Sequence, residues 1–431
     1  MNFLKKQSPV RIISLGFALV ILIGSMLLSL PCSIRDGVTL RYIDALYMST
    51  SAVCVTGLLT VDAGDTFTPL GQFFLGMLIQ VGGLGVTAVG TGVILAMGKK
   101  INLKARNLIR EAGNLDSGKG VIRFIRLVFL TTVTFELAGA ALSFLVFRKS
   151  FPPLKAAGVS LFHSVASFNN SGFDILGGGQ NLIPYQDDVL LNLVTCALVI
   201  FGGIGFLVIR EVIAKRFRWK KFSMHTKVVL FMSLVLTAAG TVLLKLTEDI
   251  TWMGAFFTSV SARTAGFSTF PLGSFSGAGL LTVIVLMVIG ASPGSTGGGI
   301  KTTTCYVLFE GIRSSATNTS EKAFRYAVPA DAFRKAAVIT LLAIGIVLSG
   351  TYILVILEPG VPFLDALFEM SSAFGTAGLS TGISAGLCDA AKILTILIMF
   401  IGRLGPLTIA SLWYFTKGER VSYPEGNIAI G

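Results

Sequence analysis

Charged residues are scarce in this chain of 431 residues, since Asp, Glu, Lys and Arg together make up only 13% of it. Hydrophobic residues account for 53%, and the mean hydropathy is +0.79, which is far more apolar than a soluble globular domain. The low charge content therefore excludes an ordinary soluble protein. Many uncharged runs are long enough to cross a bilayer, which predicts a polytopic membrane protein.

Histidine and cysteine are also rare, and their scarcity excludes two kinds of site. The two histidines, His163 and His225, lie too far apart in the sequence to predict a metal centre. The five cysteines are scattered without any CxxC spacing, so they indicate neither a disulfide framework nor a zinc site. We therefore expect no catalytic residues and no resident cofactor in this chain.

Uncharged or nearly uncharged stretches give eight candidate membrane spans. They are residues 10–30, 68–97, 125–147, 189–209, 228–246, 277–311, 335–357 and 391–415. Lys and Arg cluster in three of the connections, at 98–126, 210–227 and 313–335. The positive-inside rule places these connections and both termini in the cytoplasm. The net charge of +13 therefore reflects membrane topology rather than nucleic-acid binding.

The outward connections repeat one phrase. Residues 42–52 read YIDALYMSTSA and residues 363–373 read FLDALFEMSSA, and each phrase is followed by Gly-Leu at the same spacing. Residues 164–173 and 259–267 fit the same frame, ending in a small residue, Gly and Phe. A second glycine phrase recurs downstream, at residues 82–85, 202–205, 290–294 and 402–405. The chain is therefore predicted to be one unit repeated four times.

The four predicted units follow one another along the chain. Unit 1 covers residues 1–98, unit 2 covers 99–213, unit 3 covers 214–315, and unit 4 covers 316–431 with the C-terminal tail. Each reads as a spanning helix, a short apolar helix, a glycine turn and a second spanning helix. The short helix reaches only about half way across a bilayer, so the chain must turn back within the membrane.

Irregular backbone is tolerated at that depth only where it is buried or lines a water-filled cavity. Four such loops around one axis present backbone carbonyls and the negative ends of four short helices to a central pore, which favours a cation. The predicted fold class is an all-α membrane protein with eight transmembrane helices and four re-entrant pore loops. The alternative is that the repeated glycines serve only close helix packing.

These phrases resemble the Trk/Ktr/HKT superfamily of potassium transporters, and within it the Ktr-type membrane subunit. The resemblance covers nearly the whole chain, up to the tail YPEGNIAIG at 423–431. It implies K⁺ as the transported substrate, allows Na⁺ as an activator, and implies a homodimer in the plasma (inner) membrane. It also implies a cytosolic regulatory ring of the KtrA/TrkA type that carries the nucleotide.

By the same resemblance, the only bound metal is potassium at a selectivity filter. The filter residues are Val55, Thr56, Gly57, Asn170, Ser171, Gly172, Thr264, Ala265, Gly266, Thr376, Ala377 and Gly378. Each unit contributes one glycine, where potassium channels use TVGYG.

The stretch GASPGSTGGGIKTTT, residues 290–304, interrupts the second helix of unit 3. It is similar to a Walker A loop, but an isoleucine separates the last Gly from Lys301, and no strand precedes it. The resemblance implies instead an intramembrane gating loop under the filter. The gate residues are Gly294, Ser295, Thr296, Gly297, Gly298, Gly299, Lys301 and Arg403. Two alternatives stay open: a permanent kink with Lys301 reaching the cytosol, and an integral membrane nucleotide-binding protein or enzyme that uses this loop.

Three further charges lie at membrane depth. Arg403 occupies the second position of the glycine phrase in unit 4, and the resemblance places it on the ion path below the filter. Glu136 is expected to pair with Lys301 or with Arg403, and the alternative is a side chain that packs alone in its protonated form. Arg263, beside the third filter segment, is expected to be a scaffold residue tied to a nearby acid, because a positive charge facing the pore would repel a cation.

Overall fold

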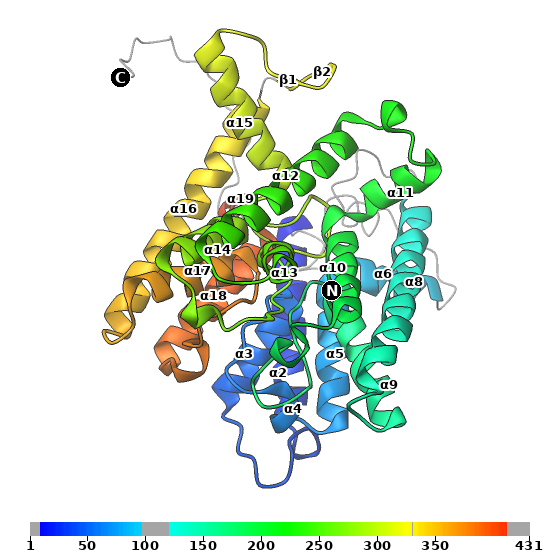
Figure 1. The fold of residues 1–431 in the computed structure, drawn as a ribbon, viewed down its shortest axis with the longest axis vertical. Coiled ribbons are helices and arrows are strands. Elements are labelled where there is room, and N and C mark those ends of the chain that lie inside the picture. Colours follow the sequence, from blue (N-terminus) through cyan, green and yellow to red (C-terminus); the bar gives the residue numbers. More distant parts are fainter. Residues whose placement is uncertain (1–8, 97–119, 330, 412–431) are drawn as a thin grey trace, which may run out of the picture.

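The structure is a computed structural model that describes residues 9–96, 120–329 and 331–411. These residues form helices joined by loops, with one small antiparallel hairpin, β1 (Lys322–Ala323) and β2 (Tyr326–Ala327). Figure 1 shows the hairpin beside the upper end of α15, away from the helices that surround the centre. The basic connection at 98–119 and the tail at 423–431 lie outside the described residues.

Four long helices and four shorter ones alternate along the chain. The long helices are α2 (Pro9–Leu28), α8 (Val121–Phe147), α12 (Met224–Thr247) and α16 (Ala332–Leu357). The shorter helices that follow them are α3 (Tyr42–Cys54), α9 (Pro153–Phe168), α13 (Trp252–Ala262) and α17 (Phe363–Gly375). With 11 to 16 residues, the shorter helices measure about 16–24 Å and cannot cross a bilayer.

A second helix follows each short one, and three of these second helices are broken at a glycine. Helices α5 (Pro69–Leu84) and α6 (Val86–Ala96) meet at Gly85. Helices α10 (Val189–Ile204) and α11 (Phe206–Ala214) meet at Gly205, and α18 (Asp389–Leu404) and α19 (Pro406–Ser411) meet at Gly405. Their φ values are 84°, 93° and 89°, with ψ of 134°, 142° and 140° for the first, second and third glycine. Only glycine adopts this region without strain.

In unit 3 the interruption is longer, because residues 289–301 separate α14 (Gly277–Val288) from α15 (Thr302–Thr317). The sequence predicts an interruption only here, with the second helices of the other three units continuous across 68–97, 189–209 and 391–415. That expectation is wrong at Gly85, Gly205 and Gly405, where the last glycine of the second glycine phrase turns the chain in units 1, 2 and 4. The bend between α10 and α11 is 97°.

Three of the four second helices start at a side-chain cap. Thr68, Asp188 and Ser276 each accept a hydrogen bond from the amide three residues on, at the start of α5, α10 and α14. Such side chains satisfy an otherwise unpaired helical amide. The irregular outer loops therefore pass into helices at fixed residues.

Contacts between the helices close into a circle. Each long helix packs on the short helix that follows it. Each second helix packs on the next short helix along the chain, so α5 contacts α9, α10 contacts α13 and α14 contacts α17. Helix α18 packs on α3, which joins the last part of the chain to the first, as the neighbouring orange and blue ribbons of Figure 1 show. The four short helices thus belong to one closed ring of helix contacts.

Four of the described helices are long and apolar enough to cross a membrane, and the α10–α11 pair adds a fifth if it is counted as one span. The chain is therefore a helical, multi-pass membrane protein. The eight-span count and the boundaries of the four units stay predictions.

Candidate ion pathway

The four predicted filter glycines come together at the C-terminal ends of the short helices. All four are buried and have positive φ, at 100°, 68°, 79° and 82° for Gly57, Gly172, Gly266 and Gly378. A Cβ built on Gly172 would lie 2.7 Å from the Ala265 carbonyl oxygen. A Cβ built on each of the other three glycines also meets a backbone carbonyl oxygen of the next segment. The pairs are Gly57 with Ser171, Gly266 with Ala377, and Gly378 with Thr56, and in each pair the carbonyl belongs to the residue just before that segment's own glycine. The segments therefore approach backbone to backbone in the order 1-2-3-4, with no room for a side chain.

The backbone just before these glycines is held by the ends of the short helices. Val55, Asn170 and Thr376 adopt the left-handed conformation, with φ of 57°, 60° and 50°. In these three segments the next amide donates to the carbonyl five residues back, at 2.7 to 2.9 Å, which is the Schellman arrangement. A β-branched residue in this conformation is strained. The helix ends therefore fix the direction of the carbonyls that follow.

The third segment departs from this pattern. Thr264 has no left-handed backbone, and the Ala265 amide donates to the Ser261 carbonyl only four residues back, at 2.8 Å. The hydroxyl of Thr264 instead hydrogen-bonds to the side-chain amide of Asn170, at 2.7 Å. The second and third segments are therefore linked by side chains as well as by packing.

The loop at 290–304 lies against the predicted filter segments. The Gly298 amide donates to the Thr376 hydroxyl at 2.9 Å, and Gly297 packs against the side chain of Thr264. The Thr296 side chain is fully buried. The loop thus touches the third and fourth filter segments directly.

Three backbone hydrogen bonds fasten the same loop to the break between α10 and α11. The Ser292 amide donates to the Gly203 carbonyl at 3.0 Å, and the Thr296 amide donates to the Gly202 carbonyl at 3.3 Å. The Phe206 amide, at the start of α11, donates to the Gly294 carbonyl at 3.1 Å. The base of the loop is closed by a parallel pairing of Ile289 with Ile300.

Two cations hold the loop from the other side. The Lys301 ammonium donates to the Gly297 carbonyl at 2.7 Å. The Arg403 guanidinium donates to the Thr296 carbonyl and to the carbonyls of Gly82 and Gly83, at the end of α5. Arg403 therefore ties the loop to both the first and the fourth unit. The side chain of Lys301 folds back onto its own loop.

The expected pairing of Glu136 is wrong. Its carboxylate accepts from Gln80 Nε2 at 3.3 Å and from Asn169 Nδ2 at 3.0 Å, and it makes no ion pair with Lys301 or Arg403 within the described residues. Both cations are instead satisfied by backbone carbonyls, which are closer to them in the fold. Glu136 buttresses the start of the second filter segment.

Arg263 was expected to contact an acidic residue. Within the described chain, its hydrogen-bond partners are instead neutral oxygens. Its guanidinium, 8% exposed, donates to the Ser233 carbonyl at 3.3 Å and lies 3.5 Å from the Thr237 hydroxyl, both on α12. Arg263 thus fastens the end of α13 to the long helix before it. This contact is consistent with a structural role for Arg263, as expected, but its partners are neutral oxygens rather than an acid.

The sequence reasoning missed an ion pair that closes the circle of units. Lys392 of α18 donates to Asp44 of α3 at 2.6 Å, and their side chains are 6% and 10% exposed. The two residues are 348 positions apart. Asp44 belongs to the repeated phrase, but its partner does not, so the sequence offered no signal for the pair.

A buried carboxylate behind the fourth filter segment was also missed. Glu369 of α17 is fully buried and accepts hydrogen bonds from the hydroxyls of Ser380, at 2.8 Å, and Ser384. Ser380 in turn accepts from the Gly382 amide at 3.0 Å. The signal was the repeated phrase itself, because Glu369 stands where its first copy has Met48. Glu369 therefore fixes the backbone that leads outward from Gly378.

The geometry presents a ring of close backbone carbonyls above a buried, hydrogen-bonded loop. Within the described residues, no group of His, Cys, Asp or Glu is arranged to hold a metal ion. The amides of Ser292, Thr296 and Gly298 already donate to protein oxygens, so the loop does not present the free amides that cradle a phosphate.

Comparison with known proteins identifies the family. Residues 17–248 and 221–416 match the TrkH family, described as cation transport proteins. The chain belongs to this family. It is 37% identical to the Ktr system potassium uptake protein B of Bacillus subtilis, with 98% of this chain and 97% of that protein covered. It is 35% identical to the potassium/sodium uptake protein NtpJ of Enterococcus hirae, with 99% and 98% covered.

The fold also matches a solved structure, the potassium transporter TrkH of Vibrio parahaemolyticus, with a TM-score of 0.75. The match covers 95% of this chain and 86% of that one at 19% identity, so it shows the shared fold. The resemblance drawn from the repeated phrases is confirmed, and the relatives are named as transporters rather than enzymes.

Proposed function

We propose that this TrkH-family member is the potassium-translocating membrane subunit of a ring-gated uptake system. Potassium passes through the four-segment filter at Gly57, Gly172, Gly266 and Gly378. The observation that carries this proposal is the cyclic approach of the filter backbones, in which each glycine faces the carbonyl of the next segment. Carbonyl oxygens arranged around an axis replace the water that a bare cation loses.

The four short helices strengthen this preference for a cation. Their C-terminal ends lead directly into the filter segments, and each helix end carries about half a negative charge. The fully buried Glu369 adds a carboxylate beside the fourth segment. An anion at this position would be repelled by the negative C-terminal ends of the short helices.

The loop at 290–304 is the proposed gate. It lies under the third and fourth filter segments and is held by Lys301 and Arg403. Since Phe206 at the start of α11 is bonded to Gly294, movement of α11 would pull directly on the loop. We further propose a homodimer with both termini cytoplasmic, K⁺ as substrate with Na⁺ as an activator, and a KtrA/TrkA-like ring that binds the nucleotide.

The test is rubidium-86 uptake by the purified chain in proteoliposomes, competed with K⁺ and with Na⁺. We expect K⁺ to compete at lower concentration than Na⁺, and uptake to change when a nucleotide-bound regulatory ring is added. ATP binding by this chain alone, with no rubidium uptake, would instead favour a membrane nucleotide-binding protein or enzyme that uses the loop.

Glu369 gives a second prediction for the filter. Glu369→Ala should lower the K⁺ preference several-fold, because two serine hydroxyls lose their shared buried acceptor, a loss of about 1–3 kcal/mol. Glu369→Gln should retain most of the preference, since its amide still bonds to the serines. The measurement is competition of rubidium uptake by K⁺ and Na⁺.

The matched control is Met48→Ala, at the corresponding buried position of α3. It removes a similar volume without removing a hydrogen bond, so it should lower protein yield rather than ion preference. Equal loss of preference in Met48→Ala and Glu369→Ala would contradict a specific role for the carboxylate.

A further inference from the structure

Two turns on one side of the molecule carry exposed cations and exposed aromatic rings. One is the turn between α11 and α12, and the other is the β1–β2 hairpin between α15 and α16. Together they form the cationic aromatic patch, whose exposed residues are Arg216, Phe217, Arg218, Trp219, Lys220, Lys221, Lys322, Phe324, Arg325 and Tyr326. Six of these ten residues are positively charged, and none is acidic.

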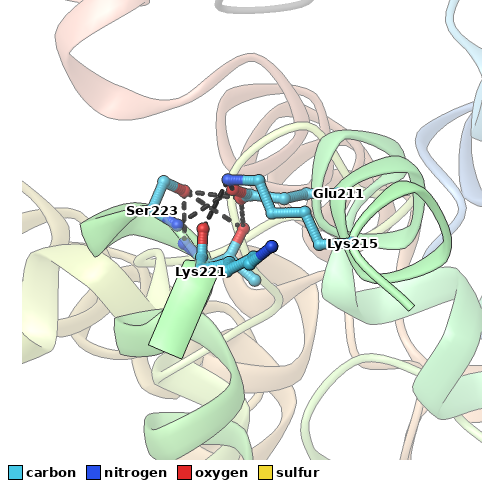
Figure 2. Close-up of polar contacts among 5 residues, drawn as sticks. Glu211, Lys215, Lys221 and Ser223 are labelled. Carbon is cyan, nitrogen blue, oxygen red and sulfur yellow. Dashed lines mark hydrogen bonds and ion pairs between the residues drawn. The ribbon is translucent and has the colours of Figure 1, made fainter. Parts of the chain in front are cut away.

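The α11–α12 turn is held rigidly at its base, as Figure 2 shows. The Glu211 carboxylate accepts from the Ser223 amide at 2.9 Å, from the Ser223 hydroxyl at 2.6 Å, and from Lys215 and Thr226. Lys215 also donates to the Lys221 carbonyl at 2.6 Å. The Glu211 carboxylate is therefore fully hydrogen-bonded at the base of the turn. It does not neutralise the cations at the tip of the turn.

Aromatic contacts join the two turns to each other and to a membrane span. The rings of Trp219 and Phe324 are 5.9 Å apart, and those of Phe324 and Phe231 are 6.2 Å apart, both nearly perpendicular. Phe231 belongs to α12, one of the four clear spans, and is 43% exposed. An apolar ring exposed on a span is placed where lipid can contact it. The aromatic side of the patch is therefore continuous with the lipid-facing surface.

At the tip of the α11–α12 turn, an exposed aromatic residue has a strained backbone conformation. Phe217 is 79% exposed and has φ of 59°, and Arg216 before it has φ of 47°. A bulky residue in this conformation is a strained exception that is concentrated at functional positions.

We infer that the cationic aromatic patch binds the headgroups of anionic phospholipids in the cytoplasmic leaflet. Cations adjoining a span attract anionic headgroups, and aromatic rings favour the membrane interface. An acidic soluble protein would satisfy the cations as well. The continuity from Trp219 through Phe324 to Phe231 favours lipid, because it places the rings at the edge of the hydrocarbon rather than out in the cytosol.

The test uses Trp219 as its own reporter. The full chain with Trp252→Phe and Trp413→Phe retains Trp219 as its single tryptophan. It is reconstituted into phosphatidylcholine vesicles that contain brominated phosphatidylglycerol or, at the same mole fraction, brominated phosphatidylcholine. We expect stronger quenching of Trp219 by the brominated anionic lipid, and we expect the excess to fall as salt concentration rises.

The charge-reversal variant is Arg216→Glu, Arg218→Glu and Lys221→Glu. Each cation near an anionic surface changes lipid enrichment by about fivefold, so the excess quenching should vanish. The matched control is Arg148→Glu, Lys149→Glu and Lys155→Glu, three exposed cations where α8 ends and α9 begins, and it should keep the excess.

Equal quenching by the two brominated lipids would overturn the inference, as would an excess that survives in the Arg216, Arg218 and Lys221 variant. A third arm adds poly-glutamate to the protein in neutral detergent and measures quenching of Trp219 by acrylamide. Protection by poly-glutamate, together with no preference for the anionic lipid, would assign the patch to an acidic protein and overturn lipid binding.

Discussion

Deletion of residues 291–299 is expected to raise K⁺ uptake about tenfold or more while leaving the ion preference unchanged. Uptake rises because the loop that lies under Thr264 and Thr376 is removed, and tenfold corresponds to about 1.4 kcal/mol of barrier. Ile289 and Ile300 lie side by side at the base of the loop, and because their pairing is parallel, the shortened chain must give up that pairing to close. Uptake velocity is measured in a host that lacks its own potassium uptake, normalised to membrane protein level, with and without the regulatory ring.

Arg403→Ala is expected to act in the same direction but more weakly, because it frees the Thr296 carbonyl and leaves the loop in place. The two changes combined should be less than additive if both oppose the same step. A deletion variant that folds and dimerises but no longer takes up K⁺ would reject the gate and favour a structural kink in the third unit.

Gly266→Ser is the second change with a large expected effect. A Cβ at this position would lie 2.9 Å from the Ala377 carbonyl oxygen and 3.1 Å from the Cα atoms of both Gly172 and Gly378. The φ of 79° adds backbone strain for any residue with a side chain. The carbonyls must therefore move apart, and we expect K⁺ over Na⁺ discrimination to fall about tenfold or more, while insertion is retained.

The matched control is Gly386→Ser, because a Cβ there meets nothing within 4 Å and the backbone is unstrained. It should leave discrimination unchanged. Competition of rubidium-86 uptake by K⁺ and Na⁺ is measured for both variants. If Gly266→Ser shows normal ion flux and unchanged K⁺ over Na⁺ discrimination, these residues do not form the selectivity filter. Glu369 would then have no role in selectivity either.

The sequence was informative wherever a feature is repeated. Because the phrase around Asp44 recurs around Asp365, the short helices and the four glycines were placed by position alone. The breaks at Gly85 and Gly205 were overlooked, since a single glycine inside an apolar run reads equally well as helix packing. At Gly205 the backbone hydrogen bonds of the 290–304 loop to Gly202, Gly203 and Phe206 show why the chain turns.

Charge partners were the least predictable part of the site. The partners of Glu136, Arg263 and Arg403 are amides, hydroxyls and backbone carbonyls, which no charge pattern reveals. A buried cation needs oxygen, and several carbonyls at a helix end satisfy it as well as a carboxylate does. The sequence therefore located these charges without identifying their partners.

The contact between α18 and α3 has a consequence for how the protein is made. Asp44 is synthesised and inserted early, whereas Lys392 emerges near the end of the chain. Until α18 arrives, the wall between the fourth and first segments is missing, and the Asp44 carboxylate lacks its buried partner. The enclosed pathway is therefore completed last. A nascent chain, or one truncated before α18, has an incomplete filter while it sits in the membrane.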